Sequence, residues 1–248
     1  MSPELFEYLS QLSRFFHVLF GILWIGLLYY FNFVGAGYLK EATPEGKKDV
    51  LQKLQPNALW YFRWAALFTF LTGVYLLYYV SLIPQAYNVG ISLGATMATI
   101  MFLNVWLIIW PNQKKVIAGT DDAAEAGAKA ALASRTNTLF SFPMLYFMIY
   151  SAHINSGNDP LIVNGEFGPG WTAYSLWIGA LIIILIELNA IFGKMRKWFE
   201  SVKAVIHSGI VLTLIFALLV QYDTSLAEWV NSFFVSETNA APNVESSE

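Results

Sequence analysis

Histidine is the residue type best suited to chemistry in this sequence, and the chain has only three: His17, His153 and His207. Each lies in or at the edge of a long apolar segment. An ionisable side chain within a membrane-spanning segment marks a functional site by default. The chain contains no cysteine, which excludes disulfides, thiolate metal sites and a covalent c-type haem. The histidines therefore indicate a cofactor that is held noncovalently within a membrane.

The composition supports a membrane location. The 248 residues are 56% hydrophobic and only 12% charged, whereas soluble domains carry roughly 25% charged residues. Apolar runs of about 20 residues are long enough to cross a bilayer as helices. The sequence predicts six such helices in an all-α, polytopic bundle, at Phe15–Val34, Ala58–Val80, Ile91–Trp110, Thr138–Ile154, Trp171–Phe192 and Val202–Tyr222.

Basic residues are distributed unevenly over the loops. Loops of one face carry Lys40, Lys47, Lys48, Lys53, Arg63, Lys114, Lys115, Lys129, Arg135, Lys194, Arg196, Lys197 and Lys203, whereas the other face has only Arg14. The positive-inside rule then places both termini outside. We expect a multi-pass protein of the bacterial inner membrane, in contact with the lipid bilayer and with both termini in the periplasm. No nucleic-acid partner is expected.

Residues 1–235 are predicted to form a single transmembrane domain. Its last part, residues 225–235, has apolar residues at helical spacing, which is typical of an amphipathic helix lying on the outer interface. Residues 236–248 are acidic, small and interrupted by proline, and this composition predicts a disordered tail.

The predicted helix boundaries assign depths to two of the histidines. A first helix that begins near Phe15 and a fourth that ends near Ile154 put His17 and His153 at the same outer level. One iron could then take an imidazole from each, an arrangement suited to electron transfer. The alternative for His153 is an interfacial residue hydrogen-bonded to water.

His207 lies nearer the inner side. It pairs in depth with Glu187, because both are ten positions from Lys197 at the centre of the hairpin between the last two helices. Glu187 and His207 could handle protons, or they could form a hydrogen bond that fastens two helices together. With helix boundaries shifted by one turn, His207 becomes a third candidate cofactor ligand.

Arg63, Asn112 and Arg135 flank the inner ends of the predicted helices. They could form a small pocket for an anion such as a haem propionate, a lipid headgroup or an anionic substrate. The alternative is structural, since Pro111 and Asn112 can stop a helix and residues 134–137 can cap the next one.

Several motifs resemble the N-terminal membrane domain of the bacterial membrane-bound urate oxidase family. They are HVLFGILWIG from His17, WYFRWAALFTFLTG from Trp60, LNVWLIIWPNQKKVIAG from Leu103, ASRTNTLFSFPMLYFM from Ala133 and, more weakly, KAVIHSGIVLT from Lys203. In that family a cytochrome c domain follows the membrane domain, and the enzyme oxidises urate and passes electrons to the cytochrome. This chain has no Cys-x-x-Cys-His motif, and its loop after the first helix lacks the segment associated with urate-oxidising members.

Three functions fit these observations. The first is a haem b protein that passes electrons toward a separate periplasmic cytochrome c, with the haem iron on His17 and His153. The second is an oxidoreductase that oxidises urate or a related small anionic heterocycle. The third is a non-catalytic subunit of a larger respiratory or photosynthetic redox complex.

Overall fold

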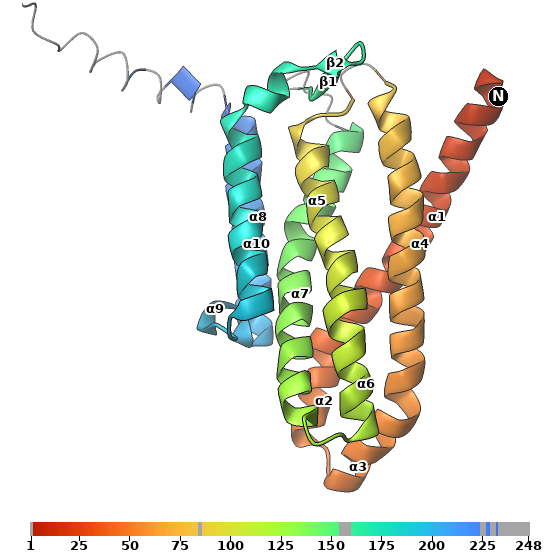
Figure 1. Cartoon of the computed structure of the whole chain (residues 1–248), viewed down its shortest axis with the longest axis vertical. Coiled ribbons are helices and arrows are strands. Elements are labelled where there is room, and N and C mark those ends of the chain that lie inside the picture. Colours follow the sequence, from red (N-terminus) through yellow and green to blue (C-terminus); the bar gives the residue numbers. More distant parts are fainter. Residues whose placement is uncertain (1, 84–85, 154–159, 224–226, 229–231, 233–248) are drawn as a thin grey trace, which may run out of the picture.

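The computed structural model describes residues 2–83, 86–153, 160–223, 227–228 and 232, and shows an all-α bundle (Figure 1). Three long rods form its first half, and each consists of two α-helices joined by a π-helix. The first contains α1 (Pro3–Tyr29), η1 (Tyr30–Gly35) and α2 (Ala36–Glu41). The second contains α3 (Pro44–Asp49), η2 (Val50–Leu54) and α4 (Gln55–Ser81). The third contains α5 (Val89–Leu103), η3 (Asn104–Ile109) and α6 (Trp110–Ala118).

The second half begins with the single long helix α7 (Ala123–His153). A short antiparallel hairpin, β1 (Ile162–Val163) and β2 (Glu166–Phe167), and the 3-10 turn η4 (Pro169–Thr172) lead into α8 (Tyr174–Phe192). The one-turn helix α9 (Lys197–Glu200) then joins α8 to α10 (Val202–Gln221).

Side-chain caps fix several helix starts. Ser2, Thr43, Asn88 and Ser201 each accept a hydrogen bond from a backbone N–H in the first turn of α1, α3, α5 and α10, which satisfies a donor that has no partner within the helix. The cap at Ser2 means that the first helix begins at Pro3 and not near Phe15 as predicted. His17 consequently lies in the middle of α1 and not near its start.

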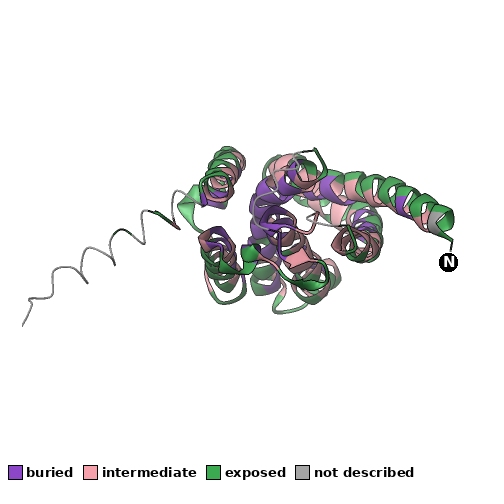
Figure 2. Cartoon of the chain, turned by 90° about the horizontal axis from the view of Figure 1, so that it is seen from above, coloured by how far each residue is buried: buried purple, intermediate pink, exposed green. Residues whose placement is uncertain are grey.

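Among the residues that the structure describes, five helices are long and apolar enough to cross a membrane, namely Glu4–Glu41, Pro44–Ser81, Val89–Ala118, Tyr174–Phe192 and Val202–Gln221. The remaining predicted span corresponds to α7. This helix packs against α5, α6, α8 and α10 and lies at the buried centre of the bundle (Figure 2). It can carry polar residues because protein surrounds it, and these residues lower its hydropathy.

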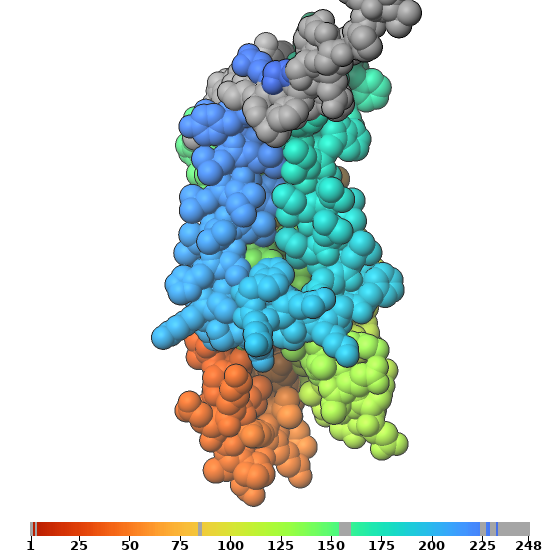
Figure 3. All heavy atoms as spheres, turned by 90° about the vertical axis from the view of Figure 1, so that its left-hand side faces the viewer, coloured from red at the N-terminus to blue at the C-terminus, as the bar shows by residue number. Residues whose placement is uncertain are grey.

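The ends of the bundle differ in charge and shape. The described N-terminus, the β1–β2 hairpin and the end of α10 share one end, and the α2–α3, α6–α7 and α8–α10 turns face the other way (Figure 1). We call these the outer and inner ends, following the positive-inside prediction. The rods of the first half extend beyond α9 at the inner end, and Figure 3 shows α3 and the α6–α7 turn projecting below it.

Polar contacts close the turns at both ends. At the inner end Lys115 forms an ion pair with Asp122 at 2.6 Å across the α6–α7 turn, and its hydrogen bond lowers the pKa of the Asp122 carboxyl. At the outer end the buried Asp223 accepts a 2.5 Å hydrogen bond from the backbone N–H of Ser175 in the first turn of α8. Asp223 thereby ties α8 to the end of α10.

The predicted interfacial helix at 225–235 falls almost wholly outside the described residues, as does the predicted acidic tail at 236–248.

Candidate functional site

His17 packs against α4 and has a defined hydrogen-bond arrangement. Its Nδ1 lies 2.9 Å from the carbonyl oxygen of Thr69 and 3.2 Å from the hydroxyl oxygen of Thr72. A carbonyl can only accept, so the Nδ1 carries the proton and donates it. The Nε2 then keeps a free lone pair, which is the state of a histidine that binds a metal with a carbonyl behind it.

Gly73 makes room for this imidazole. A Cβ at this position would lie 3.0 Å from Cε1 of His17 and 3.4 Å from its Nδ1, closer than most real contacts. A larger residue here would push the ring off the Thr69 carbonyl. The glycine in WYFRWAALFTFLTG thus lets α1 and α4 approach closely at the histidine.

The depth of His17 follows from the neighbours of α4. Phe70, beside the Thr69 carbonyl, stacks on Phe102 of α5 with ring centroids 4.3 Å apart, and Asn137 of α7 donates to the carbonyl of Met101, next to Phe102. His17 therefore lies close to the level of Asn137. His153 is 16 residues farther along α7, which is about 24 Å at 1.5 Å per residue.

His17 and His153, which we expected to bind one iron, thus lie at different depths in the bundle. His153 is the last residue of α7; its ring is exposed, and its Nδ1 bonds to the carbonyl of Ile149 in the preceding turn at 3.0 Å. The expectation of a common outer level is wrong because α1 begins at Pro3 and packs against α4 over its length.

Glu187 and His207 do not form the expected pair. His207 is exposed on α10. Glu187 instead accepts a hydrogen bond from the side-chain amide of Asn104 at 3.0 Å. An equal distance from the hairpin centre does not decide which faces of α8 and α10 turn toward each other.

Asn104 belongs to a buried network at mid-depth. Its amide also donates to the side-chain oxygen of Asn137 at 2.9 Å, and the amide of Asn137 donates to the carbonyl of Met101 at 2.9 Å. Asn104 is 2% exposed and Asn137 is fully buried. We call Asn104, Asn137 and Glu187 the mid-depth network; it joins η3, α7 and α8. The sequence offered a signal in Asn104, a single amide within an apolar run.

The structure does not show the predicted anion pocket of Arg63, Asn112 and Arg135. Arg63 lies over the ring of Trp110 at 4.0 Å, and Asn112 donates to the carbonyl of Ile108 in its own helix. Neither residue is among those that line the cavity of Arg135. The capping interpretation is wrong as well, since α7 begins at Ala123 and α6 continues to Ala118, so residues 112 and 134–137 are inside helices.

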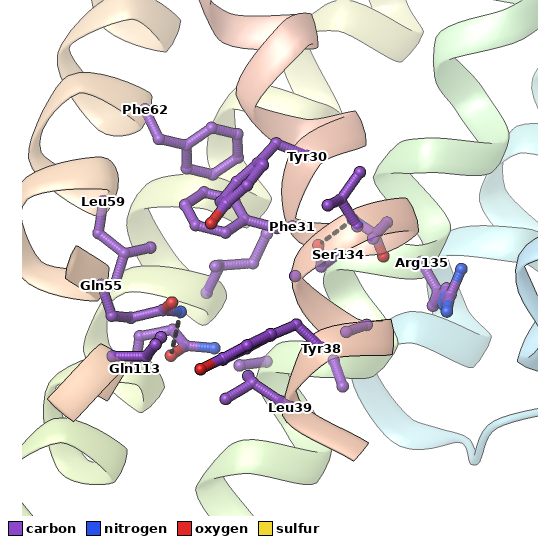
Figure 4. A pocket seen from close by; sticks show the side chains of 18 of the residues that line it. Tyr30, Phe31, Tyr38, Leu39, Gln55, Leu59, Phe62, Gln113, Ser134 and Arg135 are labelled. Atoms are coloured by element: carbon purple, nitrogen blue, oxygen red, sulfur yellow. Dashed lines mark hydrogen bonds between the residues drawn. The ribbon is translucent and has the colours of Figure 1, made fainter. Parts of the chain in front are cut away.

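Arg135 instead lines a cavity of about 650 Å³ at the inner end. Figure 4 shows the pair Gln55 and Gln113 on one side of this inner-end cavity and Ser134 and Arg135 of α7 on the other. Aromatic and polar residues line much of it: Tyr30, Phe31, Asn32, Tyr38, Gln55, Phe62, Gln113, Ser134 and Arg135. None of the three histidines is among the lining residues.

All three π-helices of the described residues contribute to this cavity. Tyr30, Phe31 and Asn32 come from η1, Val50 and Leu54 from η2, and Ile109 from η3. π-Helices account for well under 1% of residues in proteins and are frequent at functional sites. Their convergence marks the inner-end cavity as a candidate binding site.

Within the described ranges, no group of three or more histidine, aspartate or glutamate residues is arranged to hold a metal ion. The side chains suited to chemistry thus lie at three separate sites: the His17 imidazole of α1 against α4, the mid-depth network and the inner-end cavity. Together with the apolar spans they define a polytopic membrane helical bundle with polar sites inside it.

A comparison with known families finds a match to the third rod and α7. Residues 83–160 match the family described as urate oxidase N-terminal, so over this stretch the chain is similar to the N-terminal part of urate oxidases. The match spans α5 to α7 and includes Asn112, Arg135 and His153; the motifs at His17, Trp60 and Lys203 lie outside it. No curated protein and no solved structure matched the chain.

Proposed function

We propose that the chain is a redox protein that binds haem b noncovalently through His17 and passes electrons toward a periplasmic cytochrome c. The observation that carries this proposal is the hydrogen bond from Nδ1 of His17 to the Thr69 carbonyl. It holds the imidazole in the tautomer whose Nε2 can bind iron.

The residues around His17 would allow its imidazole to hold a haem. The Thr69 carbonyl and the Thr72 hydroxyl orient the ring, and Gly73 leaves it space. A haem bound there would supply one-electron chemistry at its iron. With about 24 Å between their levels along α7, His17 and His153 belong to separate irons in this proposal, His153 being the candidate ligand at the outer end.

We infer the electron acceptor from the resemblance to the urate oxidase family, and the location from the distribution of basic residues over the loops. The start of α1 and the end of α10 lie at the outer end, which the positive-inside rule would assign to the periplasm of a bacterial inner membrane. The enzymes that the chain resembles pass their electrons to a cytochrome c domain, so we propose a cytochrome c on that side as the acceptor.

Absorption spectra of the purified protein, oxidised and reduced, test the proposal. The expected result is a b-type haem spectrum that loses its His17-dependent part in His17→Ala. Because separate irons are lost independently, the haem losses of His17→Ala and His153→Ala should add up in the double variant. Complete loss in either single variant would show a shared iron, and His207→Ala should retain all haem.

Gly73→Val is the matched variant that keeps the histidine. Its side chain would crowd the imidazole, so we expect haem loss although His17 is present. Thr72→Val removes the weaker of the two acceptors and should retain haem. The proposal fails if the wild-type protein shows no haem spectrum even after haem is supplied during expression.

A second function is oxidation of urate or a related small anionic heterocycle, and the family match favours it. The test is urate-dependent reduction of the bound haem or of added cytochrome c. Haem that stays oxidised with urate and its analogues would remove this function. If the protein also co-purifies with a larger complex, an accessory role would be favoured.

A further inference from the structure

Arg63 of α4 and Lys114 of α6 share one aromatic partner in the inner half of the bundle. The guanidinium carbon of Arg63 lies 4.0 Å from the ring centroid of Trp110, and the Nζ of Lys114 lies 5.5 Å from the same centroid. Both distances are those of cation–π contacts. Two positive charges at one ring repel each other unless an anion lies beside them. The arrangement therefore favours a negatively charged group near Trp110.

No carboxylate among the described residues pairs with these two cations. Residues 55–118, which run from α4 to the end of α6, contain no aspartate or glutamate. The described ion pairs include neither Arg63 nor Lys114, although the neighbouring Lys115 is paired with Asp122. Within the described part of the chain, the buried Nε of Arg63 also has no hydrogen-bond partner. Lys114 is exposed and Arg63 is half-buried, so a ligand can reach both.

The depth of Trp110 corresponds to the inner edge of the membrane-spanning helices. Asn104 and Glu187 share a depth, because their side chains are hydrogen-bonded. Trp110 is six residues farther inward, and the end of α8 at Phe192 is five residues farther inward, which is about 9 and 7.5 Å at 1.5 Å per residue. The basic turn that begins with Lys194 follows directly. The two cations on Trp110 therefore lie at the level where basic loops and tryptophans meet lipid headgroups.

Apolar side chains continue from this level toward mid-depth. Leu103 and Leu107 of the third rod and Phe68 of α4 are exposed. Trp64 links the two helices, since it stacks on Phe68 with ring centroids 6.1 Å apart and packs edge-on against Trp106 at 5.8 Å. The surface thus combines a cationic inner end with an apolar path toward the middle of the bundle, and this pattern matches a lipid better than a free anion.

We infer that Arg63, Trp110 and Lys114 form a binding site for the phosphate of an anionic phospholipid, whose acyl chains lie along the apolar surface of α4 and the third rod. Basic pockets between membrane helices on the cytoplasmic side are known to take anionic lipid headgroups. The site is distinct from the inner-end cavity, because none of the three residues lines that cavity. It requires neither haem nor an oxidisable substrate, and so it goes beyond the proposed redox functions.

The test is native mass spectrometry of the full-length protein, delipidated in detergent and titrated with phosphatidylglycerol or with phosphatidylcholine of the same acyl chains. The two lipids differ in net charge, so the affinity for the first bound lipid isolates the contribution of the anion. We expect phosphatidylglycerol to bind at least fivefold more tightly. Arg63→Gln and Lys114→Gln should each weaken its binding about fivefold, which corresponds to about 1 kcal/mol per basic residue, and should hardly change phosphatidylcholine binding.

Arg196→Gln is the matched control. Arg196 is an exposed arginine of the basic turn after α8 and donates to Asn189. Its removal changes the net charge equally but should weaken phosphatidylglycerol binding less than twofold at physiological salt, where distant charges are screened. Trp110→Leu keeps both cations and removes the ring that holds them, so it should also weaken binding.

Lys114→Gln keeps the test decisive if Arg63→Gln or Trp110→Leu does not fold, which circular dichroism and gel filtration would show. Lys114 is exposed, so its replacement should not disturb the bundle.

Inorganic phosphate separates a lipid site from a site for a free anion. Because the acyl chains contribute to binding, an excess of inorganic phosphate should leave phosphatidylglycerol bound, and its displacement would overturn the inference. Equal affinity for the two lipids, undiminished phosphatidylglycerol binding in Lys114→Gln, or an equal loss in Arg196→Gln would also overturn it. The titration needs no haem, so its outcome is independent of the redox proposals.

Discussion

The mid-depth network and the inner-end cavity both place polar side chains inside an apolar bundle, but they differ in how those side chains are paired. In the network, Asn104, Asn137 and Glu187 bond to one another and to the Met101 carbonyl. In the cavity, Nη1 of Arg135 has no partner. Paired polar groups fasten helices together, whereas an unpaired buried charge reduces stability unless a ligand binds it. The first region therefore contributes to stability, whereas the second contains a buried charge that lacks a partner within the described residues.

The largest effect on stability is expected in the network. Asn137→Leu removes the bonds to Asn104 and Met101, and we expect a loss of about 1–2 kcal/mol in the free energy of unfolding. The measurement is denaturation by SDS in mixed micelles. Thr138→Val is the matched control: this neighbour is equally buried but bonds only to Ser134 of its own helix. Equal losses in the two variants would contradict a fastening role for Asn137.

Replacing Arg135 is expected to change the free energy of unfolding in the opposite direction. Arg135→Leu removes the unpaired charge, so in the absence of ligand the free energy of unfolding should rise by about 1 kcal/mol. Arg63→Leu removes a guanidinium that lies on Trp110 and should lower stability. A destabilised Arg135→Leu protein would mean that Arg135 is compensated within the bundle, and the contrast between the two regions would disappear.

The smallest effect is expected for Glu187→Gln. The amide oxygen can still accept the bond from Asn104, so the change in unfolding free energy should stay below about 0.6 kcal/mol, the average for one interhelical hydrogen bond in a membrane. Glu187→Leu removes the acceptor and should cost more. If Glu187→Gln retains stability but slows haem reduction or oxidation, the carboxyl has a role in proton transfer beyond fastening helices.

The residues show which parts of the fold were predictable. Long apolar runs specify membrane helices because the bilayer core leaves backbone groups no other partners, and five of the predicted spans correspond to helices suited to cross a membrane. Helix boundaries were less predictable. The cap at Ser2 and the start of α7 at Ala123 lie in polar segments, where hydropathy carries no signal.

For the candidate site residues, the sequence likewise indicated some properties and not others. Residue types alone singled out His17, His153, Glu187 and Arg135 as ionisable groups near or within apolar segments. Their partners could not be predicted, because partners depend on which face of each helix turns inward. Glu187 bonds to Asn104 and not to His207, although His207 has the same distance from the hairpin centre.

By itself the sequence determined the all-α class, the long apolar helices suited to a membrane and the grouping of the basic loops, because composition and apolar length fix these properties locally. Only the tertiary structure decided that His17 of α1 packs against α4, that two asparagines hold Glu187 in a network, and that three π-helices contribute to the cavity lined by Arg135. These arrangements depend on helix tilt and rotation, which arise from packing between segments far apart in the chain.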